Sequence, residues 1–245
     1  MHRSFAIGIV LAVATCGGWA SAQTAAPPKV WIVLASAGLA LTSGNTDTST
    51  VNAAYDITYD PHTKNVVKSD GLLLRGETEG TLSANRLGVN ARDEYRIGPR
   101  LFAFGQNQFL KDEFKRIDYL LAPTGGLGIS IFNTDRTKLA VDGGVGGVWE
   151  KNPAEDVRSS GALTAGEKLT HQLTMTTTVT QSFSGLWKTK DLEDTLFGFG
   201  AGIAVAMSTR TQIKIELLDT YSNKPPSPGV QKNDVAVPMA VVYRM

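Results

Sequence analysis

The sequence predicts an all-β protein, an antiparallel, up-and-down transmembrane β-barrel of about twelve strands, with ten strands as the alternative. Two-faced ribbons, in which apolar and polar residues alternate, recur along the chain, and no segment shows a sustained helical period. In the later part of the chain the connections between ribbons alternate between short and long. Side chains alternate between the two faces of a strand, so each ribbon indicates a strand with one apolar face.

The pattern is clearest in the final ribbon, Asp234–Met245. Its apolar row consists of Val235, Val237, Met239, Val241, Tyr243 and Met245. The opposite row is smaller and ends in the charged residue Arg244. An aromatic residue third from the end and an apolar last residue on the same face are typical of the last strand of an outer-membrane barrel. We therefore expect Tyr243 and Met245 to form the assembly signal.

Turn-forming residues divide the rest of the chain into further ribbons. Most are about ten residues long, the length that a tilted strand needs to cross a membrane. Together with the final ribbon they are expected at 31–41, 51–59, 66–75, 87–97, 101–110, 119–132, 139–149, 159–170, 173–183, 197–207, 213–217 and 234–245. The ribbon at 197–207 sets large apolar residues opposite glycine and alanine alone, whereas the ribbon at 159–170 shows the weakest alternation.

The connections between the ribbons are of two kinds. Those at 98–100, 133–136, 171–172 and 208–210 are short. Longer polar connections are expected at 76–85, 111–118, 150–158, 185–194 and 222–233. Outer-membrane barrels have short periplasmic turns and longer outside loops, and an even number of strands returns both termini to the periplasm. The two kinds of connection therefore favour such a barrel over a soluble sandwich.

Three features depart from a regular barrel pattern. Asp93 falls on the apolar row of its ribbon, Pro123 and Pro238 lie inside ribbons, and the phase of residues 101–110 is ambiguous. Proline removes a ladder hydrogen bond and inside a strand usually marks a bulge. We expect bulges at these places.

The first 22 residues have the form of a secretory signal peptide. A short basic start is followed by the apolar run Phe5–Ala14, and Ala20–Ala22 has the A-x-A form of a cleavage site. A lipid anchor at Cys16, the only cysteine of the sequence, is the alternative. The expected organisation is a signal peptide at 1–22, a short periplasmic linker at 23–29 and an outer-membrane barrel at 30–245.

Charge and histidine content argue against several functions. The sequence has 24 basic residues, one of them in the signal, and 23 acidic residues, a balance that does not favour binding to nucleic acid. His62 and His171 are expected in turns as solvated residues, and neither a metal site nor a barrel lipase can be built from them alone. We expect no enzyme activity, no metal and no cofactor.

Two glycine runs and two acidic turns could each be interpreted as a binding site or as a purely structural feature. No helix follows the glycine runs at 125–128 and 143–147, so close packing of strands is favoured over phosphate binding. The turns around Asp47 and at Asp191, Glu193 and Asp194 lack a recognised Ca²⁺ spacing. Solvated turns are therefore favoured over cation sites that bridge lipopolysaccharide.

Charged residues on the polar rows are the candidate functional residues. In a barrel these rows face the lumen, where buried charges must pair. The candidates are Arg92, Glu94, Arg96, Lys138, Asp142, Lys214 and Glu216. A salt-bridged plug and a solute-selective constriction are equal alternatives, because twelve strands lie between filled and open barrels in size.

Several segments resemble the domain of unknown function 481 family, a family of salt-induced outer-membrane proteins. These segments are Thr42–Thr48, Lys111–Phe114 with Ile117–Tyr119, Tyr221–Pro226 and Val242–Arg244. Met245 is a departure, because that family usually ends in an aromatic residue. The resemblance implies a barrel in the outer membrane of a Gram-negative bacterium and brings no catalytic residues.

The expected function is that of a non-enzymatic envelope protein, associated with salt stress by resemblance alone. The alternatives are a narrow passive pore for small polar solutes and a barrel hydrolase of lipid. The expected partners are outer-membrane lipid, lipopolysaccharide and the barrel-assembly machinery.

Overall fold

A computed structural model of the chain describes residues 30–42, 48–113, 115–225 and 231–244. The expected signal peptide and linker, the acidic turn around Asp47, and Met245 of the expected assembly signal lie outside these residues. In the part of the chain that the structure describes, no helix is long and apolar enough to cross a membrane.

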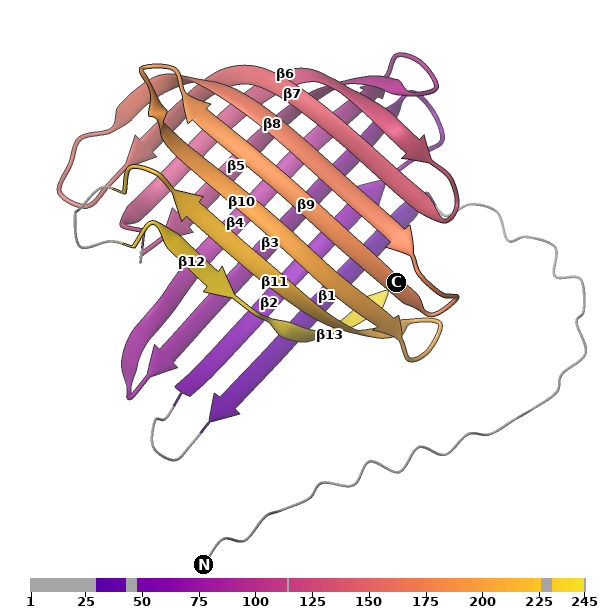
Figure 1. Cartoon of the computed structure of the whole chain (residues 1–245), viewed down its shortest axis with the longest axis horizontal. Coiled ribbons are helices and arrows are strands. Elements are labelled where there is room, and N and C mark those ends of the chain that lie inside the picture. Colours follow the sequence, from indigo (N-terminus) through magenta and orange to yellow (C-terminus); the bar gives the residue numbers. More distant parts are fainter. Residues whose placement is uncertain (1–29, 43–47, 114, 226–230, 245) are drawn as a thin grey trace, which may run out of the picture.

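The described strands form one closed antiparallel sheet (Figure 1). They are β1 (Trp31–Thr42), β2 (Thr48–Tyr59), β3 (Asn65–Thr78), β4 (Thr81–Arg96), β5 (Leu101–Asp112), β6 (Ile117–Asn133), β7 (Thr137–Lys151), β8 (Arg158–Gln172), β9 (Thr177–Lys188), β10 (Asp191–Ala206), β11 (Thr211–Ser222), β12 (Asn233–Ala236) and β13 (Met239–Arg244). Consecutive strands pair in order, and β13 pairs with both β11 and β1, which closes the barrel. Because β12 and β13 are two parts of one strand, the barrel has twelve strands, and the predicted fold class is confirmed.

The last strand is interrupted at Val237 and Pro238 without a change of register. The ladders of β11 with β12 and of β11 with β13 have the same offset. The carbonyl of Pro238 still accepts a hydrogen bond from the N–H of Glu216, at 3.1 Å. Proline therefore removes only its own N–H from the ladder, and the bulge predicted at Pro238 is wrong.

The bulges predicted at Asp93 and Pro123 are wrong as well. Both ladders of β4 keep their register at Asp93, and the ladder of β6 with β7 lacks rungs at residues 122 and 123 but resumes in the same register. The register shifts of the described ladders lie at 76/77, 110/112, 130/132 and 191/195. The shift at 110/112 lies at the end of residues 101–110, the third place where a bulge is predicted. The unchanged register keeps Asp93 on the outer row, where the side-chain amide of Asn65 lies 3.2 and 3.4 Å from its carboxylate oxygens.

Even-numbered residues face the lumen and odd-numbered residues face outward over most of the barrel. Residues paired in a ladder have the same parity, except in short stretches beside the register shifts. Odd-numbered Val145 is 64% exposed, whereas even-numbered Phe104 and Val148 are buried. Outer positions are rich in large apolar residues, as a membrane-facing wall requires.

Aromatic residues on the outer rows form a girdle near each end of the barrel. We call the end where β1 begins and β13 finishes the terminus end, and the opposite end the loop end. The terminus-end girdle contains Trp31, Tyr59, Tyr95, Phe132 and Tyr243, and the loop-end girdle contains Tyr119, Trp149, Trp187, Phe197 and Tyr221. Two such girdles flank the apolar band of a transmembrane barrel.

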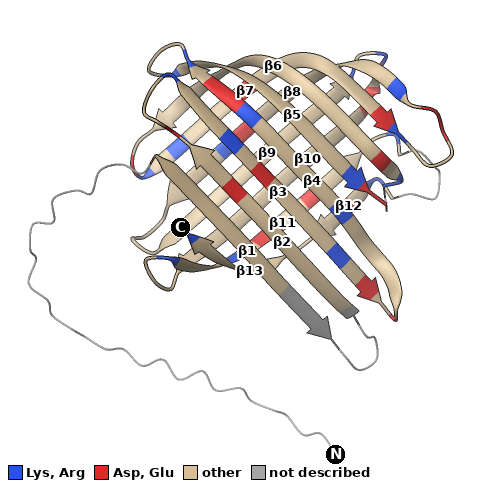
Figure 2. Ribbon diagram, turned by 180° about the vertical axis from the view of Figure 1, so that it is seen from behind, with Lys and Arg blue, Asp and Glu red and all other residues tan. Residues whose placement is uncertain are grey.

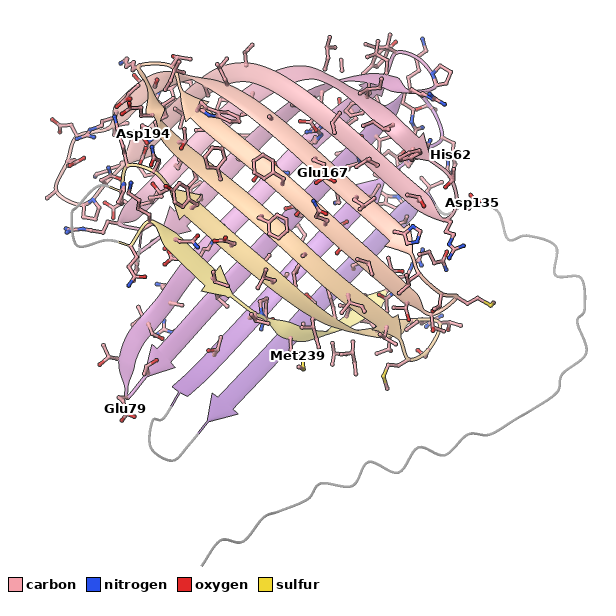
Figure 3. All side chains as sticks on the ribbon, in the orientation of Figure 1. His62, Glu79, Asp135, Glu167, Asp194 and Met239 are labelled. Atoms are coloured by element: carbon pink, nitrogen blue, oxygen red, sulfur yellow. The ribbon has the colours of Figure 1, made fainter. Side chains whose placement is uncertain are left out.

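Two of the predicted long connections are strands. β3 and β4 continue to a two-residue turn at Glu79 and Gly80, both with positive φ, of 52° and 71°. Two successive positive φ values are typical of a tight hairpin turn whose twist matches its strands. In Figure 3 Glu79 lies at the tip of this projecting hairpin. The predicted loop at 185–194 is likewise reduced to residues 189–190 between β9 and β10.

The turn predicted at 171–172 lies later, at residues 173–176. Leu173 and Met175, predicted in the apolar row of the following strand, are turn residues, and Met175 is 95% exposed. The hydroxyl of Thr174 accepts hydrogen bonds from the N–H groups of Thr176 and Thr177, at 3.2 and 3.0 Å. Threonine side chains fix turns in this way, and this local bonding overrides the apolar alternation.

The two faces of β11 offer a test of the wall assignment. Ile215 faces outward and is 40% exposed, whereas Gln212 faces the lumen. We expect Ile215→Lys to destabilise the folded state in lipid by about 2–4 kcal/mol, because a lysine would contact the acyl region. Gln212→Lys, the matched control, should have a small effect. Urea unfolding in phospholipid vesicles measures both, and equal losses would contradict the assignment.

Candidate functional site: the barrel lumen

Arg92 of β4 is the centre of a charged group on the lumen wall. Its guanidinium donates hydrogen bonds to Glu94 at 2.8 Å, to Asp142 of β7 at 2.9 Å and to Gln106 of β5 at 2.9 Å. The ammonium of Lys68 lies 2.6 Å from the second carboxylate oxygen of Glu94. We call these five residues the Arg92 cluster. The side chains of Arg92, Glu94 and Asp142 are only 12–17% exposed, and each buried charge has an opposite charge beside it.

Two aromatic rings cover the Arg92 cluster. The guanidinium carbon lies 3.9 Å from the ring centroid of Phe104 and 5.7 Å from that of Phe102, so the cation is attracted to both ring faces. The rings in turn lie against glycines of β6 and β7. A Cβ at Gly128 would overlap the ring of Phe102, and one at Gly144 would lie 3.0 Å from Phe104. The glycine runs therefore make room for aromatic side chains in the lumen.

The other predicted lumen charges lie apart from this cluster. Lys214 and Glu216 pair with each other on β11 at 2.8 Å. Arg96 lies at the terminus end, where its guanidinium pairs with Asp60. Lys138, near the start of β7, is exposed. The structure thus brings together three of the seven candidates, and the remaining four form separate contacts or none among the described side chains.

Toward the loop end, the lumen face of β5–β10 contains a cluster of buried apolar residues. Its buried residues, which we call the apolar cluster, are Leu110, Ile117, Leu120, Ala122, Val148, Ala162 and Leu186, with Leu196 packed against them. Ala122 and Ala162 are 0% and 1% exposed. Small side chains on a bare wall would touch water, so neighbouring side chains pack over the wall at this level.

A second set of contacts crosses the mouth of the barrel at the loop end. Arg86 of β4 donates a hydrogen bond to the hydroxyl of Thr220 on β11, although four strands separate β4 and β11 on the shorter way around the sheet. Lys115, in the connection between β5 and β6, is 1% exposed and pairs with Asp234 of β12 at 3.0 Å. We call these four residues the loop-end plug.

The loop-end plug is anchored to the backbone on both sides. The ammonium of Lys115 donates to the carbonyls of Gln231 and Lys232, at 3.0 and 2.8 Å. The N–H of Lys115 donates to the carboxylate of Asp112 at 3.1 Å. The buried ammonium thus donates to two carbonyls and has the carboxylate of Asp234 beside it as its counter-charge. The connection between β5 and β6 is thereby tied to the segment that leads into β12.

Charged residues also cover the apolar cluster. Lys188 of β9 contacts Glu150 of β7 and lies 2.9 Å from Asp194 of β10. A cavity of about 100 Å³ beside this triad is lined by Val148, Arg158, Lys188 and Asp194, among others. This volume accommodates only about three water molecules. Figure 2 shows the charged residues gathered at the ends of the barrel and at separate places along its strands.

The two histidines lie near the terminus end, and both bond to neighbouring groups. The N–H of His62 donates to Asp60 at 2.9 Å, and Nδ1 of His171 lies 2.8 Å from the hydroxyl of Thr137. His171 belongs to the end of β8, not to the predicted turn. Burial would raise the pKa of Asp60, but hydrogen bonds from Arg96 and from the His62 N–H outweigh it and hold that pKa below its usual value.

The predicted acidic turn at Asp191, Glu193 and Asp194 is neutralised by lysines. Glu193 lies 3.0 Å from Lys224, which also contacts Asp191, and Asp194 pairs with Lys188. The hydrogen bond to Asp191, together with that to Glu193, raises the pKa of Lys224. In the described residues, no group of three or more histidine, cysteine, aspartate or glutamate side chains is arranged to hold a metal ion.

Several residues of the lumen escaped prediction from the sequence. Phe102 and Phe104 face inward, but their strand carries apolar residues on both rows, which made its phase ambiguous. The glycines opposite them were a usable signal, because rings in a lumen need such space. No local signal identified Arg86 or Lys115, whose partners lie more than one hundred residues away in the sequence.

The fold and the lumen define a closed barrel with an apolar outer wall and a cluster of packed side chains inside its loop end. The NanC porin has this fold, with a TM-score of 0.54 and 8% identity over 87% of this chain and 99% of that one. An outer-membrane channel of Pseudomonas putida F1, named COG4313, gives a TM-score of 0.51 and 12% identity over 90% and 97% of the two chains. The translocator domain of the autotransporter NalP from Neisseria meningitidis gives 0.50 and 13% over 89% of each. The chain is similar to these proteins in fold.

A match to a family model identifies the family to which the chain belongs. The family described as "Protein of unknown function, DUF481" matches residues 35–245, so the chain belongs to it. No curated protein matches the sequence.

Removing the central cation should destabilise the barrel. Arg92→Met would leave Asp142 without its cation and Glu94 with Lys68 alone, and breaking a buried pair in this way costs about 3–5 kcal/mol. We expect the midpoint of urea unfolding in vesicles to fall accordingly. Arg92→Met combined with Asp142→Asn should recover part of the loss. A double variant as unstable as the sum of the two single variants would contradict this role of the pair.

Substitutions at Phe102 and Gly128 should also have non-additive effects on the free energy of unfolding. Gly128→Val alone places a side chain where the ring of Phe102 lies, and we expect it to destabilise the folded barrel. Combined with Phe102→Ala, the same change should be much less harmful, because the valine then fills vacated space. A double-mutant cycle of unfolding free energies measures this coupling, and additivity would show that the two residues do not share one space.

Proposed function

We propose that the protein is a non-enzymatic barrel of the Gram-negative outer membrane that closes its own lumen and serves as a structural component of the envelope. The observation that carries this proposal is the filled loop-end half of the lumen. There the apolar cluster is packed beneath the loop-end plug, and Lys115 and Ala122 are 1% and 0% exposed. A passive pore needs a continuous water-filled path, and such packing supports a lumen without one.

The Arg92 cluster supports a structural role as well. A constriction that selects solutes presents charges with free hydrogen-bonding capacity to the passing solute. Arg92 instead uses its guanidinium on Glu94, Asp142 and Gln106 and has the Phe104 ring against it. The cluster therefore joins β3, β4, β5 and β7 to one another across the lumen wall.

A role without catalysis is supported by what the histidines do. His62 and His171 lie at the terminus end, bonded to Asp60 and Thr137, and a serine hydrolase needs a histidine between a serine and an acidic partner. Outer-membrane lipid, lipopolysaccharide and the barrel-assembly machinery are the partners that this role implies. The salt-stress association belongs to the same proposal and stems from the family resemblance alone.

Single-channel recording in planar lipid bilayers tests the proposal. The folded protein should give no conductance steps at any applied voltage, while heat-dependent mobility on gels shows that it has inserted and folded. Reproducible steps from the wild-type protein would overturn the closed-lumen role and favour the narrow pore for small polar solutes. Hydrolysis of lipid, or labelling by a serine-reactive probe, would overturn the non-enzymatic role.

A further inference from the structure

A polar pair interrupts the apolar outer wall on β8 and β9. The side-chain amide of Gln181 donates a hydrogen bond to the carboxylate of Glu167 at 3.2 Å. The rungs Val141–Glu167 and Glu167–Phe183 place Glu167 on the outer row, between apolar side chains. In Figure 3 Glu167 lies on the wall midway between the two ends, far from both Asp194 and His62.

The depth of Glu167 distinguishes it from other outward carboxylates. Asp93 lies two residues from the girdle residue Tyr95, and Asp219 lies two residues from the girdle residue Tyr221. Both therefore lie at the level where water and lipid headgroups reach the wall. Glu167 lies well inside β8, which runs from Arg158 to Gln172. A carboxylate there faces the acyl region unless another protein surface covers it, and ionisable residues at such depth are expensive in lipid.

The pair keeps unused hydrogen-bonding capacity. Within the described residues, Glu167 forms no ion pair, and its one side-chain hydrogen bond is the one from Gln181. A carboxamide has two N–H donors and a carboxylate has two acceptor oxygens. One donor on Gln181 and one oxygen on Glu167 are therefore left for a partner.

The surrounding wall permits a close approach. The outer neighbours Gly143, Ala165 and Ala201 are small, and a wall with small residues lets another backbone come near. On the loop-end side, four aromatic rings in mutual contact form an apolar border. Phe183 and Phe197 have centroids 5.9 Å apart, and Trp187 and Tyr221 lie 5.3 and 6.3 Å from Phe197.

We propose that the β8–β9 face binds the same face of a second copy of this chain in the membrane. A twofold axis parallel to the barrel axis, passing between Glu167 and Gln181, sets each Glu167 opposite the other copy's Gln181. Each amide then donates its second N–H to the facing carboxylate, so the patch is complementary to itself, as an isologous interface requires. A purely basic partner would match Glu167 and leave the donors of Gln181 unused, which favours a second copy as the occupant.

Cysteine crosslinking of the full chain in vesicles tests the proposal directly. Ala165→Cys introduces a thiol on the proposed face, and Ala53→Cys introduces one on the outer row of β2, on the opposite side of the barrel. Cys16, if retained, is replaced by serine in both. We expect rapid disulfide-linked dimers from Ala165→Cys alone. No dimer from Ala165→Cys, or equal crosslinking from Ala53→Cys, would overturn the proposal.

A leucine substitution separates the interface from folding. Glu167→Leu with Gln181→Leu makes the wall uniformly apolar, so the barrel should fold in lipid at least as well as wild type. The dissociation constant of the dimer, measured by single-molecule photobleaching in vesicles, should rise at least about tenfold, as expected for the loss of two membrane-embedded hydrogen bonds. Asn107→Leu, an outward polar-to-apolar change on β5, is the matched control and should leave dimerisation unchanged. A monomeric wild-type protein, or an unchanged dissociation constant in the leucine variant, would overturn the proposal.

Discussion

The structure depends above all on the need to satisfy every backbone N–H and C=O group of a membrane-facing sheet. Lipid offers these groups no hydrogen bonds, so a spanning sheet must close on itself. The chain meets this requirement with antiparallel ladders between sequence neighbours and one closing ladder between β1 and β13. Even Pro238, which has no N–H to donate, leaves the register of the last strand intact.

Closure creates a second problem, because twelve strands enclose more space than their small inward residues fill. The chain fills this space in two different ways. Around Arg92, aromatic rings pack against glycines, and ion pairs occupy the space that apolar side chains would fill in an ordinary core. Toward the loop end, leucine, valine and alanine pack as in the core of a water-soluble protein. The contacts of Lys115 with Asp234 and of Arg86 with Thr220 cross the barrel at that end. Around Arg92 each buried charge has a partner of opposite charge, which is why this part of the lumen can contain several charges.

The sequence was sufficient for the fold because alternation is a local property. The strand number, most outward rows and the terminus-end turns other than the one predicted at 171–172 followed from residues two positions apart and from turn chemistry. Errors arose where both rows of a strand are alike, as at Phe102 and Phe104, or where an outer row contains a charge, as at Glu167 in the weakest predicted ribbon. The partners of Arg86 and Lys115 were beyond prediction, because only closure of the sheet brings them near. Predicted loops such as 76–85 became strands because two residues with positive φ suffice to reverse the chain.

Among the described residues the closing ladder is short: the rungs between β1 and β13 lie at Leu34, Ala35, Ser36 and Ala37. Every other ladder joins chain neighbours and can grow from a nearby turn, whereas this one joins segments at opposite ends of the barrel sequence. Contacts between such distant segments form late, since chain entropy opposes them until the intervening structure exists. We therefore expect the protein to fold through an open sheet with two unpaired edge strands, and the short β1–β13 ladder to close the barrel in the last step.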